Sequence, residues 1–350
     1  MPRNARRSAH ATRKVSAQDE GSGFKSGDRL SHRTMTLVER ASAAAFCPGH
    51  ITGLFEIHDE DPDPLRRGSR GAGFSLVQGV VSYVEIEPAE SLQIEIVVDK
   101  TPADAPITRE AITTVLREAV RDGRVPLNKE APKGARARVR VRAWCDVQLP
   151  ISQGFGMSAA GALSSALALT RCLRMGRSEA LRAAHAADVT LRGGLGDAVA
   201  ASVGGFEIRT APGIPPYGSV KTFLGYGDAV VCIVDGPLVT RNVLEDPAKR
   251  AAVNAAGARR LDELMKEPTL ETFLQRSQEF AKESGLLTPI MERAIQAARP
   301  HGSASMCMLG NSIFAFGNVP RLSDALARYG EVRVIPVSEA GARLVEIARP

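Results

Sequence analysis

Cysteine is scarce in this chain of 350 residues, and its pattern bears on disulfide bonds and on zinc binding. The five cysteines are scattered, odd in number and form no C-x-x-C pair, which excludes a disulfide framework and argues against structural zinc. Cysteines used in this way are typical of a reducing compartment, so we expect a cytoplasmic protein. Hydrophobic residues make up 44% of the chain, enough for a real core, which excludes fibrous and wholly disordered classes.

Several catalytic motifs are missing as well. The sequence has no Gly-Lys dipeptide, which a Walker A phosphate loop requires, and neither H-E-x-x-H nor G-x-S-x-G occurs. The run Asp59-x-Asp61-x-Asp63 begins like an EF-hand. Pro64 at its sixth position and Arg70 at its twelfth argue against a calcium loop, which needs glycine and glutamate there.

Long hydrophobic runs are also lacking. Residues 147–170 carry no formal charge, but Pro150, Gln153, three glycines and four serines make this stretch a poor membrane span. Residues 1–34 contain no apolar segment of the kind that a secretory signal needs. We therefore expect no membrane partner.

Net positive charge is concentrated at one end. Of the chain's net charge of +6, residues 1–34 carry +5, from eight Lys or Arg and three acids, which leaves +1 for residues 35–350. A nearly neutral body argues against a broad phosphate-backbone surface, so we expect no nucleic-acid partner. Composition predicts that residues 1–35 form a disordered basic tail. The alternative is that residues 1–34 lie upstream of a true start at Met35.

The hydrophobic pattern predicts an α+β fold of two domains, because both halves mix helices with antiparallel strands. A Pro/Gly-rich stretch at 211–227 separates an N-terminal domain, 36–225, from a C-terminal domain, 226–350. In the first domain, strands are predicted at 75–87, 92–98, 137–149 and 206–209. Helices are predicted from a Thr108 cap to 120, at 158–173, from a Ser178 cap to 191, and at 197–203.

The strongest local feature is Pro150-Ile-Ser-Gln-Gly154-Phe-Gly156-Met-Ser158-Ala159-Ala160. A strand ends here, a glycine turn follows, and a helix of small residues begins. Free N–H groups at a helix N-terminus form an anion site, and glycines let the backbone approach phosphate oxygens. The alternative to an anion site is a tight strand-to-helix turn that only packs on a sheet. A Rossmann fingerprint is disfavoured, because the preceding strand carries three arginines on one face, whereas Rossmann strands are apolar on both.

A second cluster contains acids after glycines. In Gly193-Gly194-Leu-Gly196-Asp197, the aspartate opens a helix, where it is either an N-cap or a base beside a substrate hydroxyl. Asp188, nine residues upstream, is either a solvated surface acid or a Mg²⁺ ligand.

Two further glycine clusters are weaker signals. His50 follows Pro48-Gly49 and is either a turn residue or part of a site. Arg70 lies between glycines in Gly68-Ser69-Arg70-Gly71, which suits bidentate capture of a carboxylate. The segment from 302 to 312 reads as a small-residue loop between two strands.

In this order, the clusters resemble the GHMP kinase superfamily, whose phosphate motif P-x-x-x-G-L-G-S-S-A-A corresponds to P-I-S-Q-G-F-G-M-S-A-A here. Within it, segments starting at Ala45, Gly68, Gly154, Gly194 and Ser305 are most similar to the archaeal pantoate kinase branch. The resemblance covers about residues 36–345 and implies an N-terminal half like domain 2 of ribosomal protein S5 with a ferredoxin-like C-terminal half.

The resemblance also implies a reaction and a site. It implies ATP- and Mg²⁺-dependent phosphorylation of the 4-hydroxyl of pantoate, toward coenzyme A, with pantoate and ATP as partners and a homodimer left open. By position, the triphosphate meets Gly154, Gly156, Ser158 and Ala159, Mg²⁺ meets Ser158 and Asp188, and Asp197 is catalytic. Arg209 matches a residue expected to hold the pantoate carboxylate, with Arg70 as the substitute anchor and His50 as a further substrate residue.

Two departures from the superfamily pattern bear on the metal. The acid at Asp188 is usually glutamate, and Met157 replaces the first serine of the motif, so Ser158 alone supplies a hydroxyl. The alternatives are a kinase of the same superfamily that acts on another small hydroxy acid or alcohol, and a non-catalytic metabolite-binding protein on the same fold.

Overall fold

The computed structural model describes residues 39–132, 137–234, 236 and 246–349, so the predicted basic tail lies outside the described residues. Its larger sheet has the strand order β12-β1-β2-β5-β3-β4, and β6 and β7 extend it from β2. Neighbouring strands are antiparallel except for β3 and β5. The strands are β1 (Ala41–His58), β2 (Gly68–Pro88), β3 (Gln93–Val98), β4 (Thr101–Pro102), β5 (Val139–Val147), β6 (Phe206–Ala211), β7 (Ser219–Phe223) and β12 (Arg343–Val345).

The alternation predicted for residues 137–149 is confirmed in β5. Val139, Val141 and Ala143 are fully buried, whereas the arginines between them face acids of β2 and β3. The arginines therefore lie on the solvent-exposed face of the sheet, where they pair with acids of the neighbouring strands. The prediction of an antiparallel strand holds for the β2 neighbour, while β3 runs parallel to β5.

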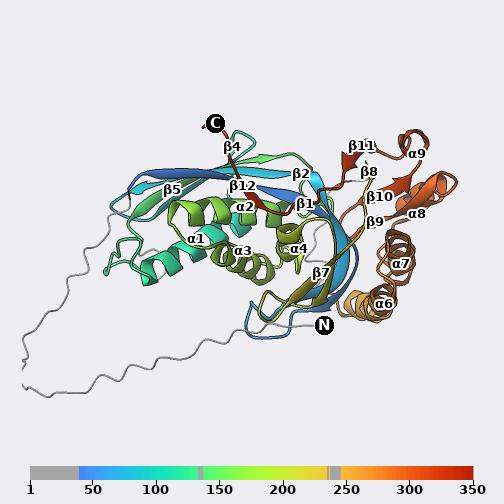
Figure 1. Cartoon of the computed structure of the whole chain (residues 1–350), viewed down its shortest axis with the longest axis horizontal. Coiled ribbons are helices and arrows are strands. Elements are labelled where there is room, and N and C mark those ends of the chain that lie inside the picture. The colour runs from blue at the N-terminus through green and yellow to red at the C-terminus, as the bar shows by residue number, and fades with distance from the viewer. Residues whose placement is uncertain (1–38, 133–136, 235, 237–245, 350) are drawn as a thin grey trace, which may run out of the picture. The chain divides into compact units, whose positions relative to one another are not determined.

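Helices cover the opposite face of this sheet (Figure 1). They are α1 (Pro106–Arg121), α2 (Met157–Cys172), α3 (Arg177–Thr190) and α4 (Asp197–Val203). Helix α2 is buried on nearly all sides, because it contacts β1 and β2 as well as α1 and α3. Its alanines, glycine and serines permit this close packing on every side.

Two predicted helix caps are wrong. Helix α1 begins at Pro106, whose ring presets the first helical φ, and Thr108 is instead buried beside Gly161 of α2. Helix α3 has Gly176 as its N-cap, and the Ser178 hydroxyl donates to Glu179 rather than accepting a backbone N–H.

A second sheet follows from residue 228, with β8 (Asp228–Ile233), β9 (Gly302–Cys307), β10 (Ser312–Gly317) and β11 (Glu331–Pro336) in the antiparallel order β11-β8-β10-β9. Helices α6 (Pro247–Lys266), α7 (Leu270–Glu283) and α8 (Pro289–Ala298) lie between β8 and β9 in the chain, and α9 (Val319–Leu326) lies between β10 and β11. The order fourth, first, third, second is the ferredoxin-like β-α-β-β-α-β arrangement. The domain boundary at residue 225 stays a prediction, and β12 returns from the second sheet to pair with β1.

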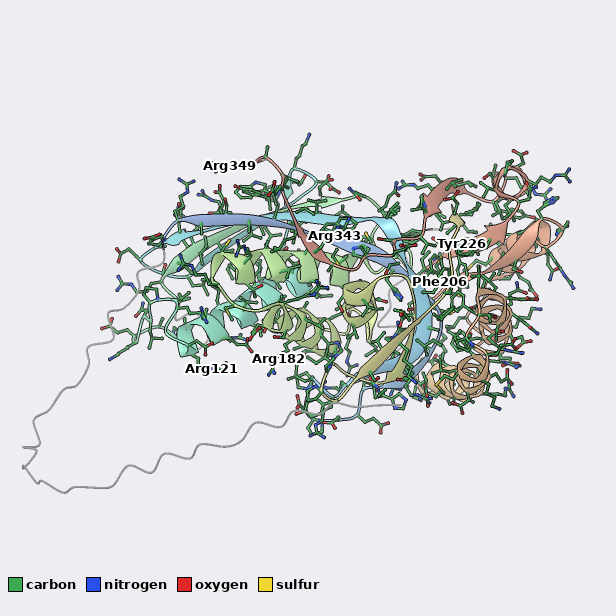
Figure 2. The ribbon with its side chains drawn as sticks, in the orientation of Figure 1. Arg121, Arg182, Phe206, Tyr226, Arg343 and Arg349 are labelled. Carbon is green, nitrogen blue, oxygen red and sulfur yellow. The ribbon has the colours of Figure 1, made fainter. Side chains whose placement is uncertain are left out.

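Phenylalanines join the two sheets. Phe74 of β2 lies 5.3 Å from Phe314 and 5.2 Å from Phe316 of β10, measured between ring centroids. Phe206 of β6, labelled in Figure 2, lies 5.8 Å from Phe273 of α7. These buried rings fix the second sheet against β1 and β2, where the site is built. Among the described residues, no helix is long and apolar enough to cross a membrane.

Candidate active site

The glycine turn before α2 needs glycine at two positions. Gly154 and Gly156 have φ angles of 83° and 66°, a region that side-chain-bearing residues rarely adopt. A Cβ at Gly154 would lie 2.9 Å from the Cβ of Cys307 on β9, and one at Gly156 would lie 3.3 Å from the Cβ of Asp197. The turn is therefore wedged between the second sheet and the start of α4.

The turn and the predicted acids line one pocket of about 290 Å³. Ser158, Ala159 and the two glycines contribute the α2 end of its wall, and Asp188 and Asp197 contribute carboxylates to the same wall. The structure thus brings together six residues that the sequence singled out from three separate segments. The remaining lining residues are Thr52, Ser152, Met157, Leu191, Arg192, Gly193, Met308 and Leu309.

Asp188 is the least expected member of this set, because the surface-acid interpretation of it is wrong. The residue is 1% exposed, and neither carboxylate oxygen has a hydrogen-bond partner. Burial, together with the charge of Asp197, raises the pKa of Asp188 well above its usual value. A buried carboxylate with two unpartnered oxygens at a pocket wall is suited to receive a cation.

Asp197 is held by a histidine. His50 Nδ1 lies 3.1 Å from Oδ1 of Asp197, and His50 Nε2 lies 3.1 Å from Oε1 of Glu207. His50 and Glu207 are buried, and the Asp197 side chain is 28% exposed at the pocket. Asp197 is the first residue of α4 rather than its N-cap, so the capping interpretation is wrong.

The pKa values of this pair move in opposite directions. Burial is the largest influence on His50 and would lower its pKa, but hydrogen bonds and charges from Asp197 and Glu207 outweigh it and raise that pKa. Burial would raise the pKa of Asp197, but His50, Arg209 and Thr52 together lower it. An ion pair between an imidazolium and a carboxylate is the consistent description.

Arg209 lies behind this pair, not at the pocket. It is 2% exposed, donates to Glu207 Oε1 at 2.5 Å and donates to Thr52 Oγ1 at 3.3 Å. Gly71 leaves room for it, since a Cβ there would come 2.6 Å from Arg209 Nη2. Gly73 does the same for His50, whose Nε2 would be 2.5 Å from an added Cβ. The glycines of β2 therefore make space for Arg209 and His50.

Arg70 lies apart from these groups. Because side chains alternate along β2, Arg70 occupies the sheet face opposite to Gly71 and Arg209. Its guanidinium pairs with Glu56 at 2.8 Å and with Asp262 at 3.2 Å. This placement corrects the expectation that the glycines around Arg70 expose its guanidinium to a substrate.

Sequence reasoning missed three residues of the site. Arg192 lines the pocket directly after α3, with a φ of 55°, and could have been noticed as the cation that precedes Gly193-Gly194. Glu207 precedes Arg209 by two residues on β6, and this spacing places both side chains on one face of the strand. Thr52 follows His50 by two residues and shares its face for the same reason.

The pocket suits Mg²⁺ by the chemistry of its donors. Among the described residues, no group of three or more His, Cys, Asp or Glu could hold a metal ion by itself. Mg²⁺ is usually bound by one or two carboxylates with phosphate oxygens and water, and Asp188 with the Ser158 hydroxyl supplies such a partial set.

Known proteins resemble this chain over most of its length. Residues 114–205 match the family model described as the GHMP kinases N terminal domain. Pantoate kinase of Thermococcus kodakarensis is 35% identical over 77% of this chain and 86% of its own length. Pantoate kinase of Methanospirillum hungatei is 29% identical over 87% of this chain and 96% of its own length.

Solved structures agree. A phosphotransferase related to the coenzyme A biosynthesis pathway is 27% identical, with a TM-score of 0.74 over 87% of this chain and 99% of its own. Homoserine kinase from Cytophaga hutchinsonii, 15% identical, shares the fold with a TM-score of 0.62 over 91% of this chain and 100% of its own. The fold is therefore that of GHMP kinases, and the chain belongs to the pantoate kinase family.

Proposed function

We propose that this protein transfers the γ-phosphoryl group of ATP to the 4-hydroxyl of pantoate, giving 4-phosphopantoate and ADP. One observation carries the proposal beyond family membership: Asp188 and Asp197 line the same pocket as the glycine turn at the start of α2. A phosphate site, a cation-ready carboxylate and a carboxylate for the acceptor hydroxyl are the parts that phosphoryl transfer needs.

The triphosphate would bind at the N-terminus of α2. Glycines at 154 and 156 let backbone N–H groups approach phosphate oxygens, and the positive end of the helix dipole favours their charge. Ser158, which is exposed on the first turn, and Asp188 would hold Mg²⁺. Bound there, Mg²⁺ would neutralise charge on the transferring group.

Asp197 would orient the acceptor hydroxyl and take its proton as the new P–O bond forms. Its Oδ1 is bound to His50, whereas its Oδ2 would lie 3.2 Å from a Cβ placed on Gly194, on the side of Asp188. Oδ2 is therefore the oxygen available to the substrate. The lowered pKa of Asp197 keeps it ionised before transfer, which suits a late proton transfer in a loose transition state.

For the substrate carboxylate, we propose Arg192 as the contact and Arg209 as its support. Arg192 lines the pocket, while Arg209 is buried and reaches the pocket through the Thr52 hydroxyl. Guanidinium pairs bidentately with carboxylates, which would fix one end of pantoate while Asp197 faces the other. Met157, Met308 and Leu309 give the pocket apolar walls for the two methyl groups of pantoate.

A coupled assay of ADP release tests the assignment. The full chain is incubated with Mg²⁺, ATP and, in turn, pantoate, mevalonate, homoserine and galactose. We expect turnover with pantoate well above that with the other acceptors. Turnover with another acceptor alone would favour a kinase of the same superfamily that acts on that compound. Binding of pantoate by calorimetry without any ADP release would favour a non-catalytic binding protein.

The state of the cysteines bears on the compartment in which the protein works. All five cysteines are free, and we propose a cytoplasmic enzyme that works without nucleic acid or membrane. Light scattering of the full chain tests the homodimer.

A further inference from the structure

Glu207 holds two cations on one carboxylate oxygen. Its Oε1 accepts from His50 Nε2 at 3.1 Å and from Arg209 Nη1 at 2.5 Å, and the residue is fully buried on β6. No role in the phosphoryl transfer described above falls on Glu207. It is absent from the pocket lining, yet it is one hydrogen-bonded group away from Asp197.

The geometry of His50 determines its protonation. Each ring nitrogen faces a carboxylate oxygen at 3.1 Å. A neutral imidazole has one N–H donor and one lone pair, so one of its nitrogens would direct a lone pair at an anion. Both contacts are favourable when His50 is an imidazolium that donates from both nitrogens. The four groups His50, Arg209, Asp197 and Glu207 then sum to zero charge, as a buried cluster requires.

We propose that Glu207 is a positioning residue that keeps His50 protonated, so that His50 holds Oδ1 of Asp197 and leaves Oδ2 for the substrate hydroxyl. This inference rests on the proposed catalytic role of Asp197. Without Glu207, His50 would lose one of its two anionic partners and would become neutral at a lower pH. As a neutral ring it could present a lone pair to Asp197, which would release the carboxylate from its fixed orientation.

Apart from Asp197 and Glu207, the described residues in contact with His50 include no anion. The Thr52 hydroxyl lies 3.5 Å from His50 Nδ1, Gly73 faces His50 from β2, and Arg209 lies beside Glu207 on β6. Cys47 is on the same strand as His50. Burial raises the pKa of the Cys47 thiol far above neutrality, so Cys47 stays uncharged. From the helices, Asp197 of α4 contacts His50, and Asp188 of α3 lies beyond Asp197.

The first test is a titration of the unaltered protein. The ¹⁵N signals of histidine-labelled full chain are followed from pH 5 to 9, and His50 is identified by its loss in His50→Gln. A His50 pKa above the ordinary 6.5 is expected, with both ring nitrogens protonated at neutral pH. A His50 ring that is mostly neutral at pH 7 overturns the proposal. No substrate is present, so this outcome does not depend on whether pantoate is the acceptor.

The second test compares Glu207→Gln with Glu85→Gln. Both remove a buried carboxylate from the large sheet, but Glu85 pairs with Arg40 and Arg349 away from the pocket. In Glu207→Gln, the His50 pKa should fall, and the loss of kcat at alkaline pH should begin at a lower pH, while kcat recovers toward acid pH. Glu85→Gln should leave both unchanged.

A purely structural role for Glu207 would give a different pattern. It would lower kcat equally at every pH and leave the His50 titration unmoved, which would overturn the proposal. Glu207→Asp, which keeps the charge, should restore the His50 pKa and the alkaline kcat together and in part, because its shorter side chain retains the anion at a greater distance from His50.

Discussion

Asp188 and Asp197 approach the same small space beside Gly194. A Cβ at Gly194 would lie 2.8 Å from Oδ2 of Asp188 and 3.2 Å from Oδ2 of Asp197. The two carboxylates come from the end of α3 and the start of α4, joined by a glycine-rich turn. Burial, and after it the like charge of Asp197, raises the pKa of Asp188, whose carboxylate oxygens have no hydrogen-bond partner. We propose that Mg²⁺ binds on the Asp188 side of this space.

Gly194→Ala should therefore fill the space that Mg²⁺ and the acceptor need. Gly194 has no positive φ, so alanine is compatible with its backbone and its effect reports on the pocket. We expect kcat/KM to fall by about 10²-fold, because misplacement of reacting groups by about 1 Å has costs of that order. Steady-state kinetics over a range of Mg²⁺ concentrations measures the change.

Gly176→Ala is the matched control. A Cβ at Gly176 meets the end of the Glu179 side chain, 2.7 Å away, which can move. Its kinetics should equal those of the unaltered protein. If Gly194→Ala were equally active, the metal would have to be bound elsewhere.

Asp188→Asn should separate stability from activity. Asp188 has its pKa raised in the folded protein above the usual 3.8, so folding favours the protonated form. The stability that this gives is complete below pH 3.8 and is lost as pH rises through the raised pKa. At neutral pH the metal-free carboxylate therefore destabilises the fold, and asparagine removes this cost.

Thermal unfolding without Mg²⁺ should show a higher Tm for Asp188→Asn than for the unaltered protein at pH 7, and equal values near pH 3.8. Addition of Mg²⁺ and ATP should raise Tm less in the variant, and Mg²⁺ affinity should weaken by about 10- to 100-fold or more. A variant with the same Tm difference at both pH values would show that the carboxylate charge is not the cause.

Kinetics can distinguish the roles of three arginines. Arg192→Ala should raise the KM for pantoate by about 10- to 100-fold, the loss expected for a charge-assisted contact, with a smaller change in the KM for ATP. Arg209→Ala removes one of the two cations that contact the buried Glu207, so we expect lower stability and a lower kcat. Arg70→Ala should leave the KM for pantoate unchanged, since its partners Glu56 and Asp262 lie on the other sheet face. The reverse pattern, with the KM effect confined to Arg209, would make Arg209 the direct contact.

Local patterns predicted most of the elements around the site. The alternation in residues 137–149, the small-residue helix after Gly156 and the short helix 197–203 all reflect interactions within a few residues, which a sequence exposes. The 18-residue strand β1 was not recognised, because its glycines, proline and small residues interrupt any regular alternation. Register shifts near Pro48 and Thr52 accommodate these residues.

The ion pairs of the site could not be predicted from local patterns. His50 and Glu207 are 157 residues apart, and their contact depends on β2 lying between their strands with glycine at the right positions. The family resemblance favoured Arg209 as the anchor, with Arg70 as the substitute. The pleat of β2 places Arg70 on the face opposite to Gly71, the residue against which Arg209 lies. Likewise, the burial of Asp188 follows from the packing of α3, which its alanine-rich sequence does not specify.

Asp197→Asn is the most direct test of the chemical step. Asparagine can keep a contact with His50 but cannot accept a proton, so kcat should fall by about 10²- to 10⁴-fold while ATP still binds. Calorimetric titration with a non-hydrolysable ATP analogue measures the binding, and ADP release measures the turnover. Asp104→Asn is the control, because the Asp104 side chain is 83% exposed and lies before α1. Loss of nucleotide binding in Asp197→Asn would mean that Asp197 acts on the nucleotide or its metal, and the acceptor hydroxyl would then need another base.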